Sequence, residues 1–424
     1  MSFMANIMNP VKGLLTRLFN SRNLAANAFS RHSLITWSEG SVQACIARFN
    51  NGSAELLGVA NSLVNGLETS GNPDMDRWGF GCEQALHQAE EMTHAEGGTR
   101  VVSDHLALGI PCDLVQAMPL VVTRNRRGQN DPIGRMEIQA LLDRGYCEAS
   151  DSLDIQNSRL QIVHSTIGQF RLDGQVVANP LGLHGSELEA SLYFSLLPLE
   201  WLRASQRLAQ QLLVQVSLLV PEEVALANYI SDESAWLVIL DYHYTLIGLV
   251  AGGQLYWSSK IPIGEREIIA DAGRMMAMQG REVDVLMRTY REGRLSEEAE
   301  NRLARALWYH LRRWMSTLAQ EAADVLANLP EQPERMYWID QSGNLSEAQD
   351  ALRTQLWAQL MGGDSAPEIV ELETTRVSEI MDCTAQTNSP VYTLTRATAL
   401  TVARITSNTD KWDWRLLQSV RKLG

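Results

Sequence analysis

Residues 241–245, Asp-Tyr-His-Tyr-Thr, bring a carboxylate, an imidazole and two phenols together within a short stretch. Groups of these types transfer protons in enzymes, so His243 is a candidate acid or base. The competing interpretation, which we favour, is a packed turn between two strands. Because no GxSxG, HExxH or intact GxxxxGK[ST] segment occurs in the sequence, we predict no catalytic residue.

The cysteines offer little chemistry. They stand far apart, without a CxxC pair and without clustered histidines. This spacing indicates reduced thiols in a cytosolic protein, so we predict no metal site. A metal site assembled from residues distant in the sequence is the alternative. The cysteines are Cys45, Cys82, Cys112, Cys147 and Cys383.

Both ends of the chain are basic, whereas the body is acidic. Residues 1–32 carry a formal charge of +4 and residues 411–424 carry +3, in a chain of net charge −14. The acidic body argues against nucleic-acid binding, which needs Lys and Arg in excess. We expect no secretory signal, because the N-terminal region lacks a continuous apolar core. The most apolar window, residues 235–253, contains Asp241 and His243, so it predicts two strands and a turn.

The two basic ends have the pattern of short amphipathic helices. In residues 9–22 the apolar side chains recur at i, i+3, i+4, i+7 and i+8, and residues 411–424 have a similar face. Such helices bind the interfacial layer of a membrane, with docking on the protein's own body as the alternative. The predicted membrane-binding residues are Val11, Lys12, Leu14, Leu15, Arg17, Leu18 and Phe19 at the first end, and Trp412, Leu416, Val420 and Leu423 at the second.

Strand-like and helix-like segments alternate between these ends, which is typical of α/β and α+β proteins. Asn51-Gly52 between two apolar runs predicts a hairpin. Asp131 and Pro132 predict the N-cap and first position of a helix. Ser296 predicts the N-cap of a long amphipathic helix. With 424 residues, of which 45% are hydrophobic, the chain is long enough for roughly two to four domains.

The order of these segments resembles that of the actin-like ATPases, most closely the FtsA type, which attaches the bacterial division ring to the membrane. The run RLDGQVVANPLGLHGSELEA, residues 171–190, is similar to the DGQ, NP-GL-G and L-E segments of the FtsA inserted subdomain. Residues 44–60, 80–92, 252–264 and 389–400 resemble further family elements, in family order. The resemblance implies an α/β, actin-like (duplicated ribonuclease-H-like) two-lobed fold with an inserted α+β subdomain.

The resemblance also implies a division of the chain. An N-terminal amphipathic segment, 1–32, would precede the first part of the first lobe, 33–100, and the inserted subdomain, 101–205. The second lobe would occupy 206–405, with a helical subdomain at about 265–330 and a return to the first lobe at its end. An amphipathic tail, 406–424, would close the chain.

The loops that hold nucleotide in the family are altered in this sequence. Actin-like ATPases bind phosphates in two glycine-rich hairpins, because backbone N–H groups must approach phosphate oxygens without a Cβ in the way. Here the first hairpin loses its Asp and a glycine, the second keeps only its Asp, and the third loop, which packs against adenosine, keeps one glycine. The degenerate pocket residues are Thr36, Ser38, Glu39, Asp241, His243 and Gly343.

These losses predict a membrane-associated scaffold or adaptor without ordinary ATP hydrolysis and without a cofactor, although binding of ATP with magnesium is an open alternative. By resemblance, its partners would be itself in head-to-tail filaments, the membrane surface and a tubulin-like division protein, with no nucleic acid. The expected location is cytoplasmic, on the inner face of the cell membrane. The alternatives are a PilM-like adaptor for pilus or secretion assembly, an active ATPase with divergent loops, and a soluble regulatory module.

Overall fold

The computed structural model describes residues 30–407, except residues 39, 65–73, 96–98, 156–158, 233, 328, 330, 331, 342, 344 and 373–376. Both terminal segments predicted to bind membrane lie outside the described residues, as does Glu39. The chain forms two compact units. The first contains the described residues up to Ser231, residues 253–256 and the described residues after 376; the second contains the rest.

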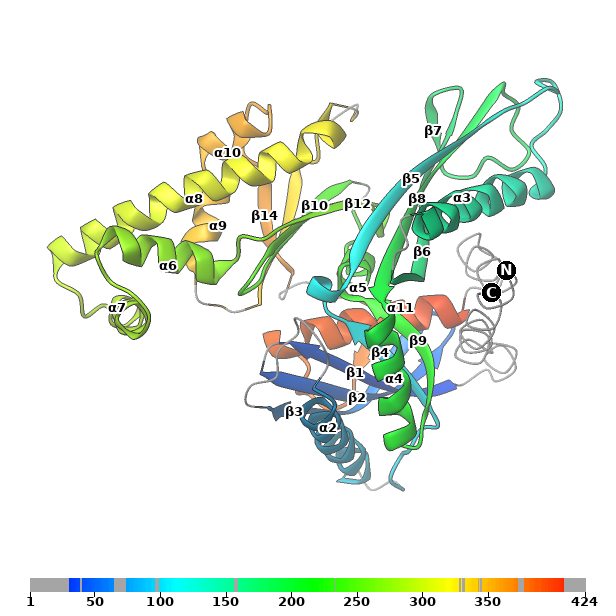
Figure 1. The fold of residues 1–424 in the computed structure, drawn as a ribbon. Helices are drawn as coiled ribbons and strands as arrows, with labels where there is room; N and C mark the ends of the chain where they lie inside the picture. The colour runs from blue at the N-terminus through cyan, green and yellow to red at the C-terminus, as the bar shows by residue number, and fades with distance from the viewer. Residues whose placement is uncertain are drawn as a thin grey trace. The chain divides into compact units, whose positions relative to one another are not determined.

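A mixed six-stranded sheet forms the centre of the first unit, with helices on both faces (Figure 1). Its strands, in the order β15-β3-β2-β1-β4-β9, are β15 (Ile380–Asp382), β3 (Ser53–Leu63), β2 (Ser41–Asn50), β1 (Ser30–Ser38), β4 (His105–Ile110) and β9 (Gln215–Pro221). The helices of this unit are α2 (Met75–Ala95), α4 (Leu199–Gln211), α5 (Glu222–Tyr229) and α11 (Thr393–Ser407), and a short 3-10 turn, Pro390–Tyr392, precedes α11.

The hairpin predicted at Asn51-Gly52 is confirmed and joins β2 to β3. Asn51 has φ 47° and Gly52 has φ 86°. Both residues therefore adopt the left-handed conformation that a tight turn between twisted strands requires, and Asn and Gly tolerate it best.

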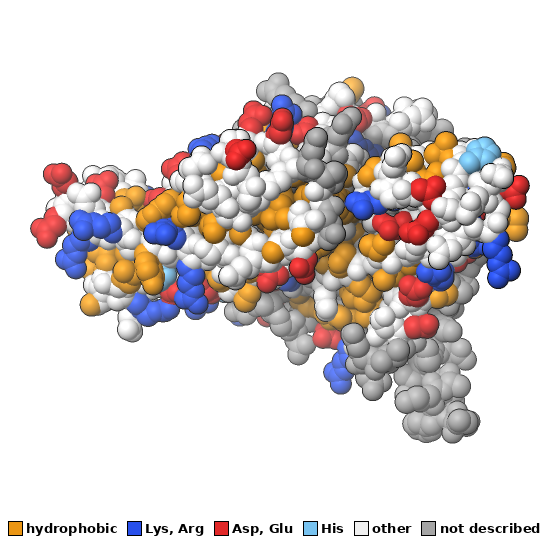
Figure 2. Space-filling view, turned by 90° about the horizontal axis from the view of Figure 1, so that it is seen from above, with side chains coloured by type: hydrophobic (Ala, Val, Ile, Leu, Met, Phe, Trp, Pro, Cys, Tyr) orange, Lys and Arg blue, Asp and Glu red, His pale blue; other side chains and the backbone are white. Residues whose placement is uncertain are grey.

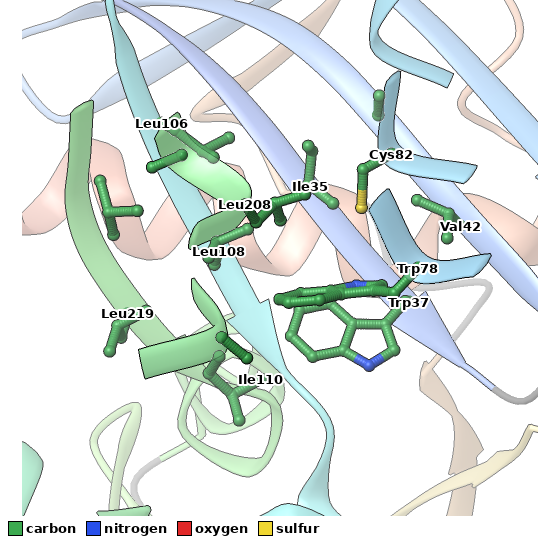
Figure 3. Close-up of a cluster of buried hydrophobic side chains, with 14 of the residues drawn as sticks. Ile35, Trp37, Val42, Trp78, Cys82, Leu106, Leu108, Ile110, Leu208 and Leu219 are labelled. Carbon is green, nitrogen blue, oxygen red and sulfur yellow. The ribbon is translucent and has the colours of Figure 1, made fainter. Parts of the chain in front are cut away.

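Tryptophan side chains fill the core on one face of this sheet (Figure 3). Trp37 on β1 lies 4.9 Å from Trp78 on α2 and stacks 6.1 Å from Trp201 on α4, measured between ring centroids. Residues alternate between the two faces of a strand. Trp37 and Ile35 therefore face α2 and α4, whereas Thr36 between them faces α11 on the other side of the sheet.

An α+β subdomain is inserted between β4 and α4. Its antiparallel sheet has the order β5-β8-β6-β7 and carries one helix. The elements are a 3-10 turn (Cys112–Leu114), β5 (Gln116–Asn125), α3 (Arg135–Ile155), β6 (Leu160–Leu172), β7 (Gln175–Val177) and β8 (Glu187–Pro198). A separate apolar cluster between α3 and the sheet, which includes Leu141, Phe170 and Phe194, is the core of this subdomain.

The predicted start of α3 at Asp131 and Pro132 is wrong, since the helix begins at Arg135. The preceding residues bond to a neighbouring loop instead. The Ile133 amide donates to the Leu183 carbonyl over 2.8 Å, and the Ile133 carbonyl accepts from the Gly182 amide over 2.9 Å. These long-range bonds hold the segment extended, and they outweigh the local capping preference of Asp131.

A second mixed sheet, in the order β12-β11-β10-β13-β14, organises the second unit. Its strands are β10 (Ala235–Leu240), β11 (Thr245–Ala251), β12 (Gln254–Ile261, of which residues 254–256 belong to the first unit), β13 (Arg335–Asp340) and β14 (Glu368–Glu371). Its helices are α6 (Glu265–Met275), α7 (Arg281–Arg291), α8 (Glu297–Leu326), α9 (Ser346–Leu352) and α10 (Gln355–Leu360). The predicted cap of α8 is confirmed, because the Ser296 hydroxyl accepts from the Ala299 amide.

Residues 206–231 lie in the first unit, whereas the sequence assigns them to the second lobe. The reason is strand pairing, because β9 extends the first sheet beside β4 in parallel. The other proposed domain limits stay predictions. None of the described helices is long and apolar enough to cross a membrane.

Candidate functional site

The first altered loop is a tight turn between β1 and β2. Ser38 pairs with Ser41 in the register of the two strands, so only residues 39 and 40 connect them. The two serine hydroxyls lie 3.0 Å apart, and the Gly40 carbonyl accepts from the Val64 amide over 2.8 Å. Gly40 has φ 75°, a conformation that favours glycine. So short a turn offers few backbone N–H groups to a phosphate.

Thr36 belongs to a buried polar triad instead of a metal site. Its hydroxyl lies 3.1 Å from Gln43 Oε1 and 3.0 Å from Thr395 Oγ1, and the Thr395 hydroxyl lies 3.2 Å from the same Gln43 oxygen. All three side chains are buried, and they come from β1, β2 and α11. A neutral triad whose members bond to each other is compatible with burial, whereas an unpaired carboxylate at Thr36 would be costly.

The second altered loop, residues 241–244, closes on itself between β10 and β11. Leu240 pairs with Thr245, which leaves four residues for the turn. The Asp241 amide donates to the Tyr244 carbonyl over 2.9 Å. The Asp241 carboxylate accepts from the His243 amide over 3.2 Å, so it orders the turn.

The same turn covers the N-terminus of α6. The Glu265 amide donates to the Asp241 carbonyl and the Arg266 amide donates to the Tyr242 carbonyl, each over 3.0 Å. A helix N-terminus with free amides can bind an anion; here carbonyl oxygens occupy both amides. Gly264 makes this contact possible, because a Cβ there would lie 2.5 Å from the Tyr242 carbonyl oxygen and 2.5 Å from the Tyr244 nitrogen.

Side chains beside the second turn also form hydrogen bonds and ring contacts. The Thr245 hydroxyl donates to the Ile263 carbonyl over 2.7 Å and accepts from the Trp314 indole over 2.9 Å. Tyr244 is buried, and the Lys260 ammonium lies 5.5 Å from its ring centroid. The His243 ring meets the Tyr242 ring edge to face. These contacts describe a packed turn, which is the interpretation favoured from the sequence.

The third loop follows β13. The Asp340 carboxylate accepts from the Gly343 amide over 2.9 Å, and the Gln341 amide donates to the Leu240 carbonyl over 3.0 Å. Gly343 has φ 65°, so the glycine serves the turn. Asp241 directly follows β10 and Asp340 ends the neighbouring parallel strand β13, and each carboxylate accepts from an amide of its own loop.

The pocket residues are divided between the two units. Thr36 and Ser38 belong to the first unit, and Asp241, His243 and Gly343 belong to the second. Sequence reasoning missed Gln43, Thr395 and Gly264, which complete the two closed hairpins. Only Gly264 had a local signal, as the glycine before a helix. In the described part of the chain, no three His, Cys, Asp or Glu side chains are grouped to hold a metal ion.

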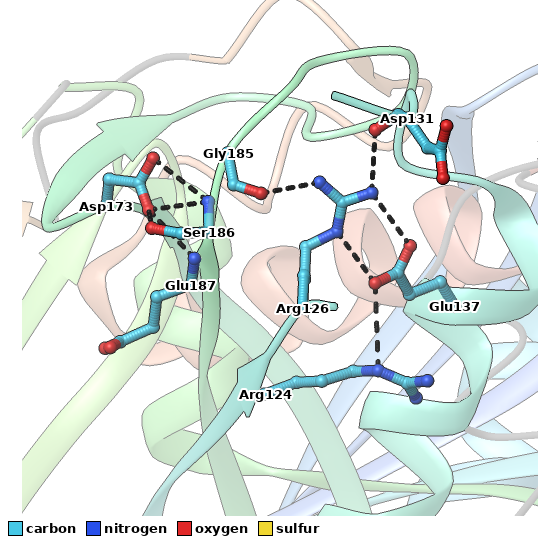
Figure 4. A network of polar contacts seen from close by, with 8 residues as sticks. All are labelled: Arg124, Arg126, Asp131, Glu137, Asp173, Gly185, Ser186 and Glu187. Carbon is cyan, nitrogen blue, oxygen red and sulfur yellow. Dashed lines mark hydrogen bonds and ion pairs between the residues drawn. The ribbon is translucent and has the colours of Figure 1, made fainter. Parts of the chain in front are cut away.

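The run 171–190 owes its pattern to a loop that Asp173 closes (Figure 4). The Asp173 carboxylate accepts from the Ser186 hydroxyl over 2.6 Å and from the Glu187 amide over 2.8 Å. These bonds, first the one from the Ser186 hydroxyl, lower the pKa of Asp173. Asp173 itself has φ 50°, in the turn between β6 and β7.

Arg126 fastens the other side of the same loop (Figure 4). Its buried guanidinium donates to the Gly185 carbonyl over 2.7 Å, to the Asp131 carbonyl over 2.9 Å and to the Glu137 carboxylate over 2.8 Å. Arg124 lies further from the same carboxylate, at 3.7 Å. The segment before α3 and the loop before β8 are therefore fixed to each other, and the run has a structural role.

Known proteins are similar to this chain in structure only. No family model matches the chain, and no curated protein matches it in sequence. A structure of the PilM-PilN type IV pilus biogenesis complex matches with a TM-score of 0.58 and 12% identity, over 89% of this chain and 99% of the other. The ROK hexokinase of Thermus thermophilus matches with a TM-score of 0.43 and 13% identity, over 88% of this chain and 97% of the other. The cytoplasmic domain of EpsL, an inner membrane component of the Vibrio cholerae type II secretion system, matches with a TM-score of 0.34 and 11% identity, over 88% and 95%.

The chain has the α/β actin-like ATPase fold, so the fold class expected from the sequence is confirmed. The structure that supports this most strongly among those reported is that of the PilM-PilN complex. The narrower resemblance to FtsA has no such support. The weaker matches, with TM-scores below 0.5, carry no further argument.

Proposed function

We propose that this chain is a non-catalytic adaptor in the assembly of a membrane-associated machine of the pilus or secretion type. The observation that carries the proposal is the closure of both hairpins that would grip phosphates. In the first, only residues 39 and 40 connect β1 to β2. In the second, the carbonyls of Asp241 and Tyr242 occupy the first amides of α6.

A nucleotide phosphate needs several free N–H groups and a metal held by carboxylates. Here the Asp241 carboxylate accepts from an amide of its own turn, and Thr36 supplies a hydroxyl that bonds within a buried triad. An actin-like fold with these two closed hairpins lacks the groups that bind phosphate, but its surfaces can still bind partner proteins.

The partner follows from the likeness to PilM, which forms a complex with PilN in type IV pilus biogenesis. We infer that this chain likewise binds a protein of an assembly machine, and that it acts at the cytoplasmic face of the membrane. The predicted amphipathic ends, residues 9–22 and 411–424, support the membrane location. Two weak lipid contacts in one chain would strengthen each other by raising the effective concentration.

Head-to-tail filaments and a tubulin-like division partner, which the FtsA resemblance implies, stay predictions. The run 171–190 carried that resemblance most strongly. In the folded protein its Asp173 closes a loop, so its pattern has a sufficient explanation in folding. Cross-links in cells to a division protein, and none to pilus or secretion proteins, would favour the FtsA-like function over the one proposed.

Calorimetric titration of the purified chain with ATP and magnesium tests the loss of nucleotide binding. We expect no heat of binding at millimolar ATP, either for the natural chain or for the variants. The informative variant is Asp241→Ala, and Asp284→Ala, which removes an exposed carboxylate from α7, is its matched control. Tight binding that Asp241→Ala abolishes and Asp284→Ala preserves would refute the proposal.

A further inference from the structure

The outward side of α8 is unusually basic for so acidic a protein. Residues 301–320 contain four arginines and no acidic residue, in a chain of net charge −14. An aromatic pair lies between the arginines. We call this surface the α8 arginine face; it consists of Arg302, Arg305, Trp308, Tyr309, Arg312 and Arg313.

Helical spacing places these side chains together. Residues three and four apart lie on one side of an α-helix, so Arg305, Trp308 and Arg312 follow one line along α8. Trp308 is 38% exposed and Tyr309 is 61% exposed. The opposite side of α8, which includes Leu311 and Trp314, is buried in the second unit. The apolar stripe of the helix is therefore already used, and the arginine face is directed outward.

The four guanidinium groups lack acidic partners. Among the described residues, none of them forms an ion pair, and Arg305 donates only to the Asn301 carbonyl one turn earlier. Exposed arginines elsewhere in the same unit do form ion pairs, as Arg335 does with Glu368 at 2.9 Å. A face that presents four arginines outside ion pairs is complementary to an anionic surface.

The neighbouring helix α6 extends this surface. Met275 is 56% exposed, and its sulfur lies 3.2 Å from His310 Nε2 on α8. Burial and then the positive charges of Arg313 and Arg274 lower the pKa of His310. The Asp271 carboxylate of α6 lies 3.5 Å from His310 Nδ1 and pairs with Arg274. Among the described residues, the α6 arginine is therefore neutralised whereas Arg313 is not. Figure 2 shows basic side chains together with hydrophobic and acidic side chains on the viewed face of the molecule.

The geometry points to the α8 arginine face as a contact surface for an anionic phospholipid bilayer. The face covers residues 302–313 of α8, about 17 Å along the helix axis, so its side chains can reach one planar surface together. Trp and Tyr are the side chains that lie at the level of lipid headgroups, and Arg side chains extend from such a level to phosphates. Anionic lipid repels the acidic remainder of the chain. The protein should therefore bind with the α8 arginine face towards the bilayer.

This inference rests on the membrane location in the proposed function, but it can fail separately from it. The test uses the full chain and vesicles of phosphatidylcholine with or without 30% phosphatidylglycerol, separated by flotation. The variant Arg305→Glu/Arg312→Glu reverses two charges on the face. The matched control Arg203→Glu/Arg207→Glu reverses two exposed arginines on α4, in the other unit.

Each basic residue near an anionic surface contributes about a fivefold increase in binding, so the α8 variant should bind phosphatidylglycerol vesicles at least about 30-fold more weakly. The control should bind within about threefold of the natural chain, because single charges far from the contact are screened. Binding should also weaken in 1 M salt. Circular dichroism melts of both variants verify that they fold.

A second readout distinguishes the α8 face from the terminal segments. An environment-sensitive dye attached at Asn301→Cys, in a Cys147→Ser background, should brighten on phosphatidylglycerol vesicles. A silent dye, or unchanged binding of the α8 variant, would overturn the inference while leaving the absence of nucleotide binding intact. Loss of a specific acidic protein partner from the α8 variant, with no lipid binding by the natural chain, would also overturn it in favour of a protein-docking face.

Discussion

Replacing Arg126 by Met tests whether the run 171–190 is a structural feature. Arg126 is buried, and its guanidinium is shared by the Glu137 carboxylate and the carbonyls of Asp131 and Gly185. Met fills similar space but removes every donor. The substitution leaves the Glu137 carboxylate and two carbonyls without their main partner, in the loop region that Figure 4 shows.

The expected cost is about 3–5 kcal/mol, because removing the buried Arg126 leaves the Glu137 carboxylate and two carbonyls without their main donor, and Arg124 is the other arginine near that carboxylate. The exposed neighbour Arg124 offers the matched control. It lies 3.7 Å from the same carboxylate, with a side chain that is 42% exposed. Arg124→Met should therefore cost about 0–1 kcal/mol.

Hydrogen exchange is the appropriate assay, because the chain has two units and its overall melting need not be two-state. The amides of Arg126, Ile133 and Gly182 form long-range backbone bonds across this loop region. A cost of 3–5 kcal/mol should increase their exchange rates by about 10²–10⁴-fold if local opening controls exchange. Amides of the second unit should exchange as before.

Protection that is unchanged in Arg126→Met would refute the structural assignment of the run. The combination Arg126→Met/Glu137→Leu supplies a further check, since apolar replacement of both partners should restore part of the lost protection. If the double variant is as unprotected as the single one, the carbonyl contacts at Asp131 and Gly185 carry the stability instead of the ion pair.

Three further predictions concern other sites. Burial lowers the pKa of His32 to about 3 in the folded protein, from 6.5. The unfolded chain therefore takes up the proton first as pH falls, and His32 should account for about 2 kcal/mol of the stability lost between pH 7.5 and pH 5, beside the buried His164, whose pKa burial lowers to about 4. His32→Leu should remove its own share from denaturant titrations. Gly264→Ala should destabilise the second unit by about 3 kcal/mol in a melting experiment, the upper part of the range for overpacking, because backbone atoms 2.5 Å away cannot move aside. In the same experiment Gly134→Ala should cost far less, because the added carbon meets nothing within 4 Å. Burial raises the pKa of the Cys45 thiol, whereas Cys147 is exposed; iodoacetamide should modify Cys147 and spare Cys45 in the native protein, and equal labelling of both would contradict the buried position of β2.

Local signals were sufficient where neighbouring residues decide the conformation. Asn51 and Gly52 tolerate the left-handed conformation that a tight hairpin needs, and the turn forms between the predicted strands. Ser296 caps α8 because its hydroxyl reaches an amide three residues later. The alternation of such elements predicted an α/β or α+β protein, and the resemblance of their order and motifs to the actin-like ATPases implied the actin-like fold class.

Distant contacts explain where the sequence was insufficient. Asp131 and Pro132 have the preferences of a helix start, but bonds from Ile133 to residues 182 and 183 keep that segment extended. A capping preference of a few tenths to about 1 kcal/mol competes here with two long-range backbone hydrogen bonds, which together contribute about as much or more. The sequence of residues 131–134 does not indicate that this segment bonds to the loop at residues 182 and 183.

The candidate site divides in the same way. From the resemblance to the actin-like ATPases, the sequence predicted that glycines and one Asp are missing from the phosphate loops, because the family needs those residue types at fixed places. Only the tertiary structure decided what replaced them. Thr36 meets Thr395 across 359 positions of the chain, and the first amides of α6 meet carbonyls of the 241–244 turn. A buried polar group forms hydrogen bonds with the partner that the fold places beside it. The identity of that partner therefore depends on the tertiary structure and not on the local sequence.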